Sequence, residues 1–386
     1  MWFIDLFKLL RPLSKKEKEK IEELEEFLYA NEAKKLKRLV KLKKAAFSSL
    51  TLGVSDSILK RRHFTILQDS QDEFIKEINE KIVSQIKKKA FKEFSENAPD
   101  VMIELIAPNI VGLHRIKEAV SLQLFADERV HILLLGDPAT GKTDIVRAAA
   151  ELSPAASFGL GSGISGAGLG LMFKGDELIM GLLPKSNGGI CCIDELNLIR
   201  KDDLGYLYNA MEKGFISYDK AGKSIQLNAD VKVLATANPL KDRFTSTDIE
   251  LLRKQIPLDA ALLTRFHIVF IIRKPSLRRF IDIAKKMVKQ KTKELSSSDI
   301  SFIKEYISYC KKIDVEFPME LQKKIVEFAG DMKERERSFV MDVSPRLIAG
   351  LMRLAKASAR MQLRRAVNEE DLEKVRDILI DSLKVK

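Results

Sequence analysis

Short apolar runs alternate with stretches of helical periodicity between residues 109 and 275. Four of these runs have the length of a strand and are almost wholly apolar: His131–Leu135, Gly189–Ile193, Val231–Ala235 and His267–Ile271. Strands that are apolar at successive positions are typical of a parallel sheet covered on both faces. The alternation therefore predicts an α/β domain built on a parallel sheet, which we place at residues 99–275.

After Pro275 the strand pattern ends, and helical periodicity continues to Leu383. An Asn followed by acidic residues, as at Asn368, is typical of a helix start. We expect a separate helical domain over residues 276–386, with helices at Ile300–Lys312, Met319–Lys333, Pro345–Gln362 and Glu369–Leu383.

Residues 1–98 are dense in charge and follow a mostly helical pattern, and Pro99 and Pro108 bracket the junction that follows. Apolar positions are interleaved with cations, so one helix face can pack while the other stays basic. Two interpretations remain open, a solvated helix face and a DNA-contacting arm. The basic positions are Lys34, Lys35, Lys37, Arg38, Lys41, Lys43, Lys44, Lys60, Arg61 and Arg62.

Composition narrows the class of protein. The 386 residues carry a net charge of +12, which favours an anionic partner such as nucleic acid over a merely lysine-rich surface. The 3 cysteines form no C-x-x-C pair, so we expect no zinc site and a reducing compartment. No apolar run approaches the roughly 20 residues that span a bilayer. The apolar start contains Asp5 and Lys8 and lacks a cleavage site, so we expect a cytoplasmic protein without a signal peptide or membrane contact.

A phosphate-binding motif follows the first predicted strand directly. It reads Gly136-Asp137-Pro138-Ala139-Thr140-Gly141-Lys142-Thr143, and a helix is expected from about Thr143 to Leu152. Small residues let backbone amides curl around a phosphate, Lys142 brings a charge to the terminal phosphates, and the Thr143 hydroxyl can hold Mg²⁺. The motif with its flanking elements predicts a site for a nucleoside triphosphate and Mg²⁺.

Polar residues follow the next two predicted strands. Asp194 and Glu195 come at the end of one, and Asn238 comes shortly after the other. At the carboxyl edge of a parallel sheet, Asp194 would organise the Mg²⁺ shell and Glu195 would polarise the attacking water. Asn238 would orient that water or touch the γ-phosphate. The structural alternatives are a solvated strand end and an Asn-Pro turn.

Two arginines complete the set of candidate catalytic residues. Arg265 precedes the last strand, and Arg346 lies in the first turn of a C-terminal helix after Ser344 and Pro345. Arg265 could stabilise transition-state charge on the nucleotide of a neighbouring subunit. Arg346 could contact phosphate or make a surface ion pair.

The order of these motifs resembles that of AAA+ ATPases, and their detail resembles the MCM branch. MCM proteins carry a Gly-Asp-Pro phosphate loop, like Gly136-Asp137-Pro138 here. The resemblance covers about residues 99–383. Further matching segments are 106–112, the hairpin 210–222 with its closing residues 227–229, Ser344-Pro345-Arg346 and Ala359-Arg360-Met361.

The resemblance implies ATP and Mg²⁺ as cofactors, DNA as partner and assembly into hexameric rings, alone or with other MCM subunits. It implies that Arg265 and Arg346 serve the nucleotide of the adjacent subunit. It also places Lys220 in a central channel against the DNA backbone, beside a second insert at Gly159–Gly170. The residues themselves predict a hairpin whose turn carries two cations, Lys220 and Lys223, with a solvated tip as the alternative.

The chain departs from the family pattern at several positions. About 100 residues precede the ATPase segment, without cysteine or an alternating strand pattern, where MCM proteins usually carry an OB-fold and commonly a zinc module. The resemblance is therefore to a divergent, archaeal-type or mobile-element homologue. Lys213 replaces the usual glutamine, and His267 replaces the usual aspartate. The arginine that usually precedes the phosphate-loop strand is displaced, and Arg129 could substitute for it.

Three functions remain open at this point. The first is an ATP-driven DNA helicase or translocase acting in DNA replication. The second is a remodelling ATPase of the MoxR kind, which acts on proteins. The third is an ATP-gated scaffold or regulator that joins a true MCM ring and has no helicase activity.

Overall fold

The computed structural model describes residues 87–220, 223–241, 243–246, 248–289 and 295–383. Apart from residues 295–299, these belong to one compact unit made of Gln85–Thr292 and Ile300–Lys386, and the description below concerns that unit. The basic block predicted between residues 34 and 62 lies outside the described residues. None of the described helices is long and apolar enough to cross a membrane.

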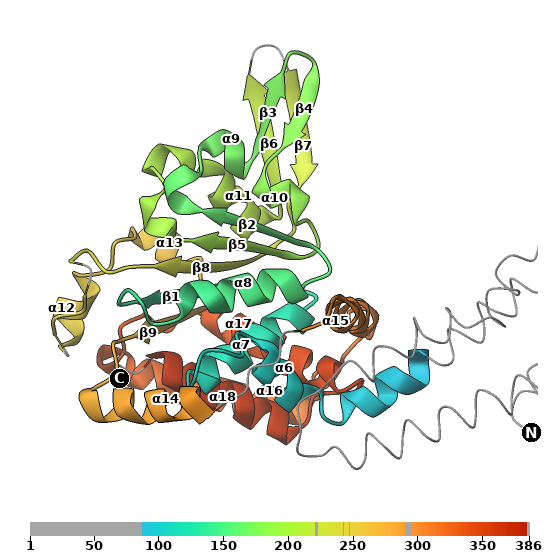
Figure 1. The fold of residues 1–386 in the computed structure, drawn as a ribbon, viewed down its shortest axis with the longest axis vertical. Helices are drawn as coiled ribbons and strands as arrows, with labels where there is room; N and C mark the ends of the chain where they lie inside the picture. Colours follow the sequence, from blue (N-terminus) through green and yellow to red (C-terminus); the bar gives the residue numbers. More distant parts are fainter. Residues whose placement is uncertain (1–86, 221–222, 242, 247, 290–294, 384–386) are drawn as a thin grey trace, which may run out of the picture. The chain divides into compact units, whose positions relative to one another are not determined.

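A parallel five-stranded sheet with the order β2-β5-β8-β1-β9 forms the centre of the unit (Figure 1). Its strands are β1 Ile132–Gly136, β2 Ala156–Leu160, β5 Ile190–Asp194, β8 Lys232–Ala237 and β9 Ile268–Ile272. The predicted α/β class and parallel sheet are confirmed, and the four predicted strands begin one residue later than expected. Strand β2 was not predicted. It lies at the sheet edge, and its one buried residue is the polar Ser157, so it has no apolar run to mark it.

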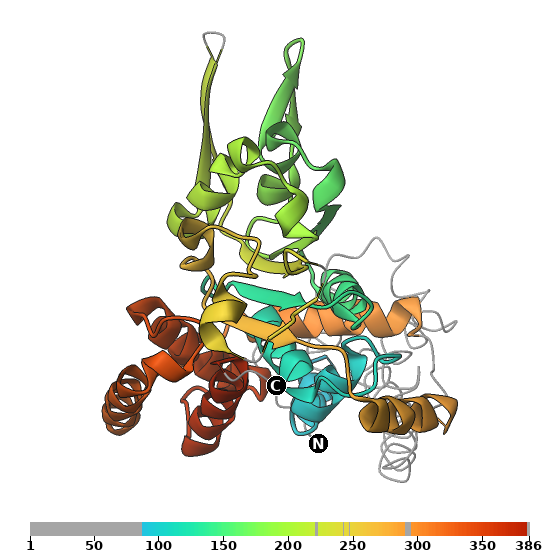
Figure 2. The same cartoon turned by 90° about the vertical axis from the view of Figure 1, so that its left-hand side faces the viewer.

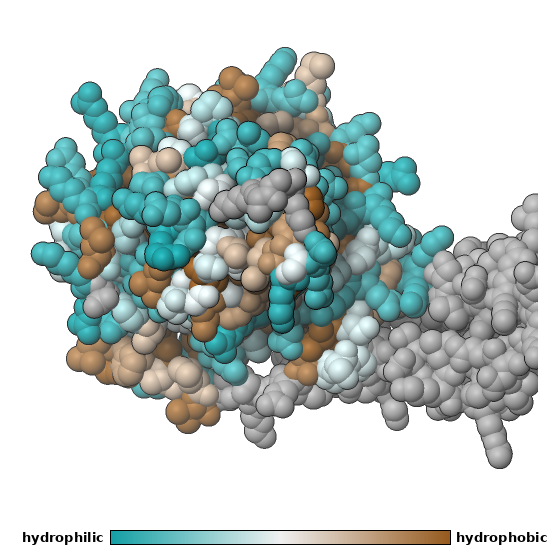
Figure 3. Space-filling view, turned by 90° about the horizontal axis from the view of Figure 1, so that it is seen from above, coloured by the Kyte–Doolittle hydropathy of each residue, from teal (hydrophilic) through white to brown (hydrophobic). Residues whose placement is uncertain are grey.

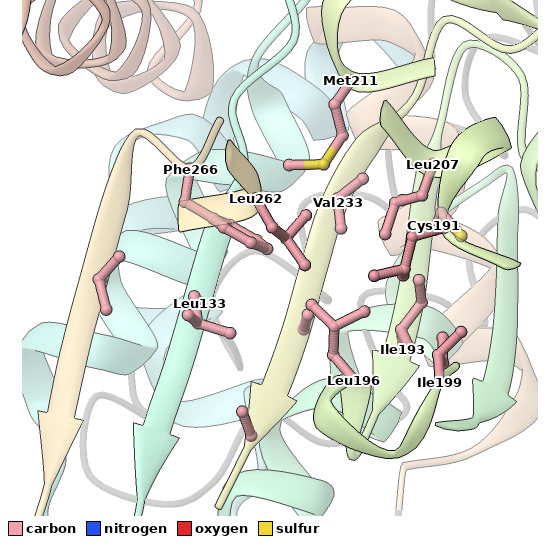
Figure 4. Packing of buried hydrophobic residues seen from close by; sticks show 14 of the residues in the cluster. Leu133, Cys191, Ile193, Leu196, Ile199, Leu207, Met211, Val233, Leu262 and Phe266 are labelled. Atoms are coloured by element: carbon pink, nitrogen blue, oxygen red, sulfur yellow. The ribbon is translucent and has the colours of Figure 1, made fainter. Parts of the chain in front are cut away.

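Both faces of the sheet are buried, which explains the continuous apolar runs of the central strands. Successive side chains point to opposite faces, so alternate positions such as Leu133, Cys191 and Val233 share one face. There they pack with Leu207 and Met211 of α11 in one hydrophobic cluster (Figure 4).

Helices surround the sheet. The phosphate-loop helix α8 packs on β2, β5 and β8, α18 packs on the edge strand β9, and α7 joins α8 to α17 and α18. The helices from Ala98 onward are α6 Ala98–Leu105, α7 His114–Phe125, α8 Lys142–Leu152, α9 Gly166–Leu169, α10 Leu182–Lys185, α11 Gly205–Lys213, α12 Ile249–Arg253, α13 Ala260–Leu263, α14 Leu277–Lys289, α15 Ser297–Cys310, α16 Met319–Glu334, α17 Pro345–Met361 and α18 Glu369–Leu383.

Two antiparallel hairpins project from the same side of the unit (Figures 1 and 2). The first is β3 Leu171–Lys174 with β4 Glu177–Met180, and the second is β6 Phe215–Lys220 with β7 Lys223–Asn228. The second confirms the hairpin predicted from the sequence, with Lys220 paired to Lys223 across the turn. Hydrophilic residues predominate on the face seen from the hairpin side (Figure 3).

The position expected for the second insert needs correction. The segment Gly159–Gly170 was predicted to be that insert, but Gly159 and Leu160 belong to β2, and the β3–β4 hairpin begins after Gly170. The glycines mark the turns and short helices at 161–170, and the two strands of the insert follow them in less glycine-rich sequence. The insert is therefore longer than expected and includes a hairpin.

The predicted C-terminal helices are all present, with bounds within three residues of those expected, and α14 precedes them. Helix α17 begins as expected: the Ser344 side chain accepts a hydrogen bond from the Leu347 amide, and Pro345 follows the cap. The fully buried Arg360 joins α17 to the α/β layer. Its guanidinium donates to Asp127 at 2.7 Å and to the Phe125 carbonyl at 3.4 Å.

Candidate functional site: the two edges of the sheet

The predicted phosphate loop joins the carboxyl end of β1 to the start of α8, as expected. Its curvature depends on left-handed backbone at Ala139 (φ 59°) and Gly141 (φ 83°). The backbone conformation of Gly141 favours glycine, and a Cβ there would lie 2.9 Å from Cδ1 of Ile110 and push that side chain aside. The loop leaves a cradle of backbone at the N-terminus of α8, which suits a phosphate group.

Lys142 is buried in this loop. In the structure its Nζ donates to the carbonyl oxygens of Gly136 at 2.8 Å and Asp137 at 2.7 Å. Burial lowers the pKa of Lys142 to about 8, while the nearby carboxylates of Asp194, Asp137 and Glu195 act in the opposite direction. Its charge has no direct carboxylate partner among the described contacts, so an arriving phosphate would supply one.

Asp137 fastens the loop to two other segments. Its carboxylate oxygens accept hydrogen bonds from the backbone amides of Phe244 and Lys274, each at 2.9 Å. Its carbonyl accepts the Thr140 hydroxyl at 2.8 Å. The side chain of Asp137 thus binds the chain that follows β8 and β9. Sequence reasoning assigned Asp137 to the nucleotide site and missed this contact.

The carboxylates predicted after β5 lie beside the loop. Asp194 is 4% exposed, and its Oδ2 accepts the Thr143 hydroxyl at 2.9 Å. Glu195 is half-buried and has left-handed backbone (φ 55°), which turns the chain sharply at the strand end. A hydroxyl next to a carboxylate is an oxygen donor set that Mg²⁺ accepts. The residues present therefore fit the nucleotide and metal that the motif implies.

Asn238 follows β8 at the same edge of the sheet, and its backbone amide donates to Oδ1 of Asn197 at 3.1 Å. Strands β5, β8 and β1 are neighbours, so their carboxyl ends bring the loop, Asp194, Glu195 and Asn238 together. Sequence reasoning missed Asn197 and also Thr236, whose hydroxyl bonds to Asp194. A threonine between two alanines near the end of a mostly apolar strand was the available signal for Thr236.

The two predicted arginines lie together, but at the opposite side of the sheet, where the amino ends of the strands lie. We call this side the arginine edge and the side with the carboxyl ends the phosphate edge. Arg265 precedes β9 and donates to Glu212 of α11 at 2.6 Å, and its guanidinium lies over the Tyr208 ring at 4.9 Å. Arg346 donates to the Thr264 carbonyl at 3.1 Å. Burial lowers the pKa of Arg346, as do Arg265 and Arg353, against the effect of Glu212.

The separation of the two edges follows from strand geometry. The phosphate loop follows the carboxyl end of β1, whereas Arg265 precedes the amino end of the neighbouring β9. A strand of five residues is roughly 16 Å long. The structure thus brings Arg265 and Arg346 together with each other and not with the phosphate loop of the same chain.

Two buried histidines, His131 and His267, directly precede β1 and β9 at this edge. The backbone amide of His131 donates to Nδ1 of His267 at 3.0 Å, and Nη1 of Arg353 lies 3.2 Å from Nε2 of His267. Burial lowers the pKa of His131 to about 3 and that of His267 to about 2, so both rings are neutral at pH 7. His267, which replaces the usual aspartate, therefore adds no negative charge to this edge.

Arg129 also lies at this edge. It donates to Asp230 at 2.8 Å, and its carbonyl accepts Nη1 of Arg353 at 2.6 Å. Its replacement of the displaced family arginine stays a prediction.

The hairpin lysines occupy the tip of β6–β7, where their backbones pair. Lower on the hairpins, the Phe173 ring of β3 lies 5.4 Å from the Tyr218 ring of β6. This contact joins the two hairpins. The side chains of Lys220 and Lys223 lie outside the described part of the structure, and their contact with DNA stays a prediction.

Comparison with known proteins assigns the family. The family profile for the MCM P-loop domain matches residues 83–291, and the profile for the MCM AAA-lid domain matches residues 301–383. The chain is 29% identical over 329 residues to "Minichromosome maintenance protein MCM" of Saccharolobus solfataricus, covering 79% of this chain and 48% of that protein. It is 29% identical over 324 residues to "DNA replication licensing factor MCM5" of Arabidopsis thaliana, covering 74% and 44%.

A third relative is "DNA replication licensing factor MCM4" of Arabidopsis thaliana, 30% identical over 341 residues, with 78% of this chain and 39% of that protein covered. The chain thus spans about half or less of the length of the curated relatives it matches. The matches favour the MCM interpretation over the MoxR alternative. With both profiles matched in order and more than half of the sequence covered by the first alone, the chain belongs to the MCM family.

Proposed function

We propose that this chain binds ATP with Mg²⁺, hydrolyses it in a ring of like subunits, and uses the energy to move along or unwind DNA during replication. The observation that carries the proposal is the hydrogen bond between Thr143 and Asp194 beside Lys142, at the edge opposite Arg265 and Arg346. One chain then supplies the phosphate-binding half of a site, and a neighbour supplies the arginine half. The names of the relatives, which refer to minichromosome maintenance and DNA replication licensing, support the role in replication.

The roles at the phosphate edge follow from the chemistry of each group. The loop amides and Lys142 would bind the phosphates, and Thr143 and Asp194 would hold Mg²⁺. Bound Mg²⁺ would neutralise charge on the phosphate oxygens. Glu195 would accept a proton from the attacking water, and Asn238 would orient that water.

The roles at the other edge require a second subunit. A heterologous, head-to-tail contact that closes into a ring presents the arginine edge of one subunit to the phosphate edge of the next. Arg265 and Arg346 would then stabilise the charge that develops on the γ-phosphate of the neighbour's nucleotide. For this, Arg265 exchanges its contact with Glu212, which is half-exposed, for the phosphate.

Lys220 and Lys223 would contact the DNA backbone from the hairpin tip. Phosphate contacts made by lysine release counterions, so DNA affinity should fall steeply as salt is raised. The test is ATP hydrolysis measured with and without single-stranded DNA over a salt series. Stimulation that falls with salt supports the proposal, and hydrolysis that is indifferent to DNA at all salt concentrations contradicts it.

A matched pair of variants assigns the effect to the hairpin. Lys220→Ala should weaken DNA binding and remove the stimulation, whereas Lys286→Ala, on the exposed surface of α14, removes the same charge and should leave the stimulation intact. Equal loss in both variants would mean that net charge, and not the hairpin, attracts DNA. Wild-type protein without turnover would instead favour the scaffold alternative.

A further inference from the structure

Thr236 lies near the end of β8, between the two strands that carry the phosphate loop and the acidic pair. It is 1% exposed, and its neighbours in the strand are apolar. Its hydroxyl donates to Oδ1 of Asp194 at 2.5 Å and accepts a hydrogen bond from the backbone amide of Glu195 at 2.9 Å. One hydroxyl therefore uses its proton and its oxygen on two successive residues of the acidic pair.

The first of these bonds orients the carboxylate of Asp194. Its Oδ1 is tied to Thr236 and its Oδ2 faces the Thr143 hydroxyl. Rotation of the carboxylate would break the bond to Thr236 inside a buried site, where a lost hydrogen bond has no water to replace it. Thr236 thus keeps Oδ2 directed toward the phosphate loop.

The second bond supports a strained turn. Glu195 has φ 55° and ψ 48°, a left-handed conformation that residues with a Cβ rarely adopt. The backbone of Gly161 packs against this turn so closely that a Cβ there would lie 2.0 Å from the Glu195 carbonyl oxygen. Such strain persists where the surroundings fix the chain, and Thr236 binds the amide at the centre of the turn.

We propose that Thr236 is a positioning residue, whose hydroxyl sets the Asp194 carboxylate for Mg²⁺ and the Glu195 turn for the attacking water. The proposal rests on the function proposed above and deepens it. Strand β8 therefore positions three residues of the site. It orients Asp194 and Glu195 through the Thr236 hydroxyl, and Asn238 directly follows it in the chain. Groups of this kind, which orient metal ligands from behind, typically change metal affinity or activity 10- to 100-fold when removed.

The test uses two pairs of variants that differ in the hydroxyl and little in size. Thr236 is compared with Thr236→Val, and Thr236→Ser with Thr236→Ala. The affinity of the full chain for mant-ADP is measured in EDTA and over a MgCl₂ series, together with ATP turnover and thermal unfolding. Without the hydroxyl we expect about 10- to 100-fold more Mg²⁺ for half-maximal effect and a lower turnover, with unchanged affinity in EDTA.

The serine variant should resemble the wild type. The inference is overturned if Thr236→Val has wild-type Mg²⁺ dependence and turnover, or if Thr236→Ser is impaired as much as Thr236→Ala. Unfolding of both hydroxyl-free variants would also overturn it, because the hydroxyl would then serve the fold. Wild-type protein that binds Mg²⁺ and mant-ADP without turnover would contradict the proposed hydrolysis, while the Mg²⁺ titrations would still decide the role of Thr236.

Discussion

The two edges of the central sheet differ in how their charged groups are satisfied. At the phosphate edge, the carboxylates of Asp137 and Asp194 accept hydrogen bonds from backbone amides and hydroxyls of the same chain. At the arginine edge, cations are close enough to disfavour one another's charge, and the ion pair of Arg265 is with a half-exposed Glu212.

This difference indicates what each edge needs from outside. The phosphate edge is internally fixed around a cradle, which suits a small anionic ligand that is replaced in every cycle. At the arginine edge, Arg346 donates to a backbone carbonyl, and the Nε atom of Arg265 is buried without a hydrogen-bond partner among the described residues. The other arginines of this edge form ion pairs with carboxylates: Arg129 with Asp230, Arg265 with Glu212 and Arg353 with Glu128. An edge of this kind is suited to a partner that brings negative charge, such as a nucleotide on the next subunit.

Breaking the arginine edge should have the largest effect. Arg265→Ala should reduce turnover by about 1000-fold or more, since an arginine acting on a neighbour's nucleotide contributes in that range. ATP binding should persist, because Arg265 lies at the edge away from the phosphate loop of its own chain. The measurement is steady-state hydrolysis beside mant-ATP binding.

Mixing distinguishes action on a neighbour from action within one chain. Arg265→Ala and Lys142→Ala should each be inactive, but an equal mixture should regain about a quarter of the wild-type rate, because one random contact in four joins two intact halves. A mixture that stays inactive although the subunits exchange would contradict the division of the site between two edges.

Breaking the phosphate edge at Glu195 should have the next largest effect. Glu195→Gln keeps the size of the side chain but removes its ability to accept a proton, so turnover should fall at least about 100-fold. Binding of mant-ATP should remain within a few-fold of the wild type. Substitution of Glu177, an exposed glutamate of β4, to Gln is the control and should leave turnover unchanged. Turnover retained in Glu195→Gln would assign the proton to another group.

The phosphate edge could be predicted from sequence better than the arginine edge. The loop residues from Gly136 to Thr143 are contiguous and follow an apolar strand, so local pattern places them, and Asp194 and Asn238 follow because neighbouring parallel strands end together. The contacts of Arg265 with Glu212 and of His267 with His131 join segments far apart in sequence, so no periodic pattern in the sequence predicts them. The edge strand β2 was not predicted because it pairs with β5 on one side only and has a single buried residue, so its sequence lacks a continuous apolar run.

The neutral histidines of the arginine edge should make the fold sensitive to acid. Their pKa values are about 3 for His131 and about 2 for His267 in the folded chain, and lie near 6.5 when unfolded. Below about pH 6.5 the unfolded chain therefore binds more protons than the folded chain. As the pH is lowered further, the free energy of unfolding should fall by up to about 1.4 kcal/mol per pH unit for each histidine.

Denaturant unfolding between about pH 6 and pH 4 measures this slope. His267→Asn keeps an acceptor for the His131 amide and cannot titrate, so its slope should be smaller by about 1.4 kcal/mol per pH unit. An unchanged slope in this variant would show that carboxylates, and not the buried imidazoles, account for the acid sensitivity.

Titration of Lys142 provides the smallest and most selective test, at the phosphate edge. Burial lowers its pKa to about 8, so the free chain loses this charge as the pH rises through that value. A bound phosphate favours the charged form, and binding above pH 8 must therefore take up a proton, which weakens nucleotide affinity by about tenfold between pH 7 and 9. Lys142→Arg keeps its charge throughout this range, so its affinity, whatever its absolute value, should be nearly independent of pH.

The same pH dependence in both proteins would assign the titration to a group other than Lys142. A flat profile in Lys142→Arg alone would assign the titration to Lys142, whose pKa is lowered by burial and which forms no direct ion pair among the described contacts, in contrast to Arg265, which is already paired with Glu212.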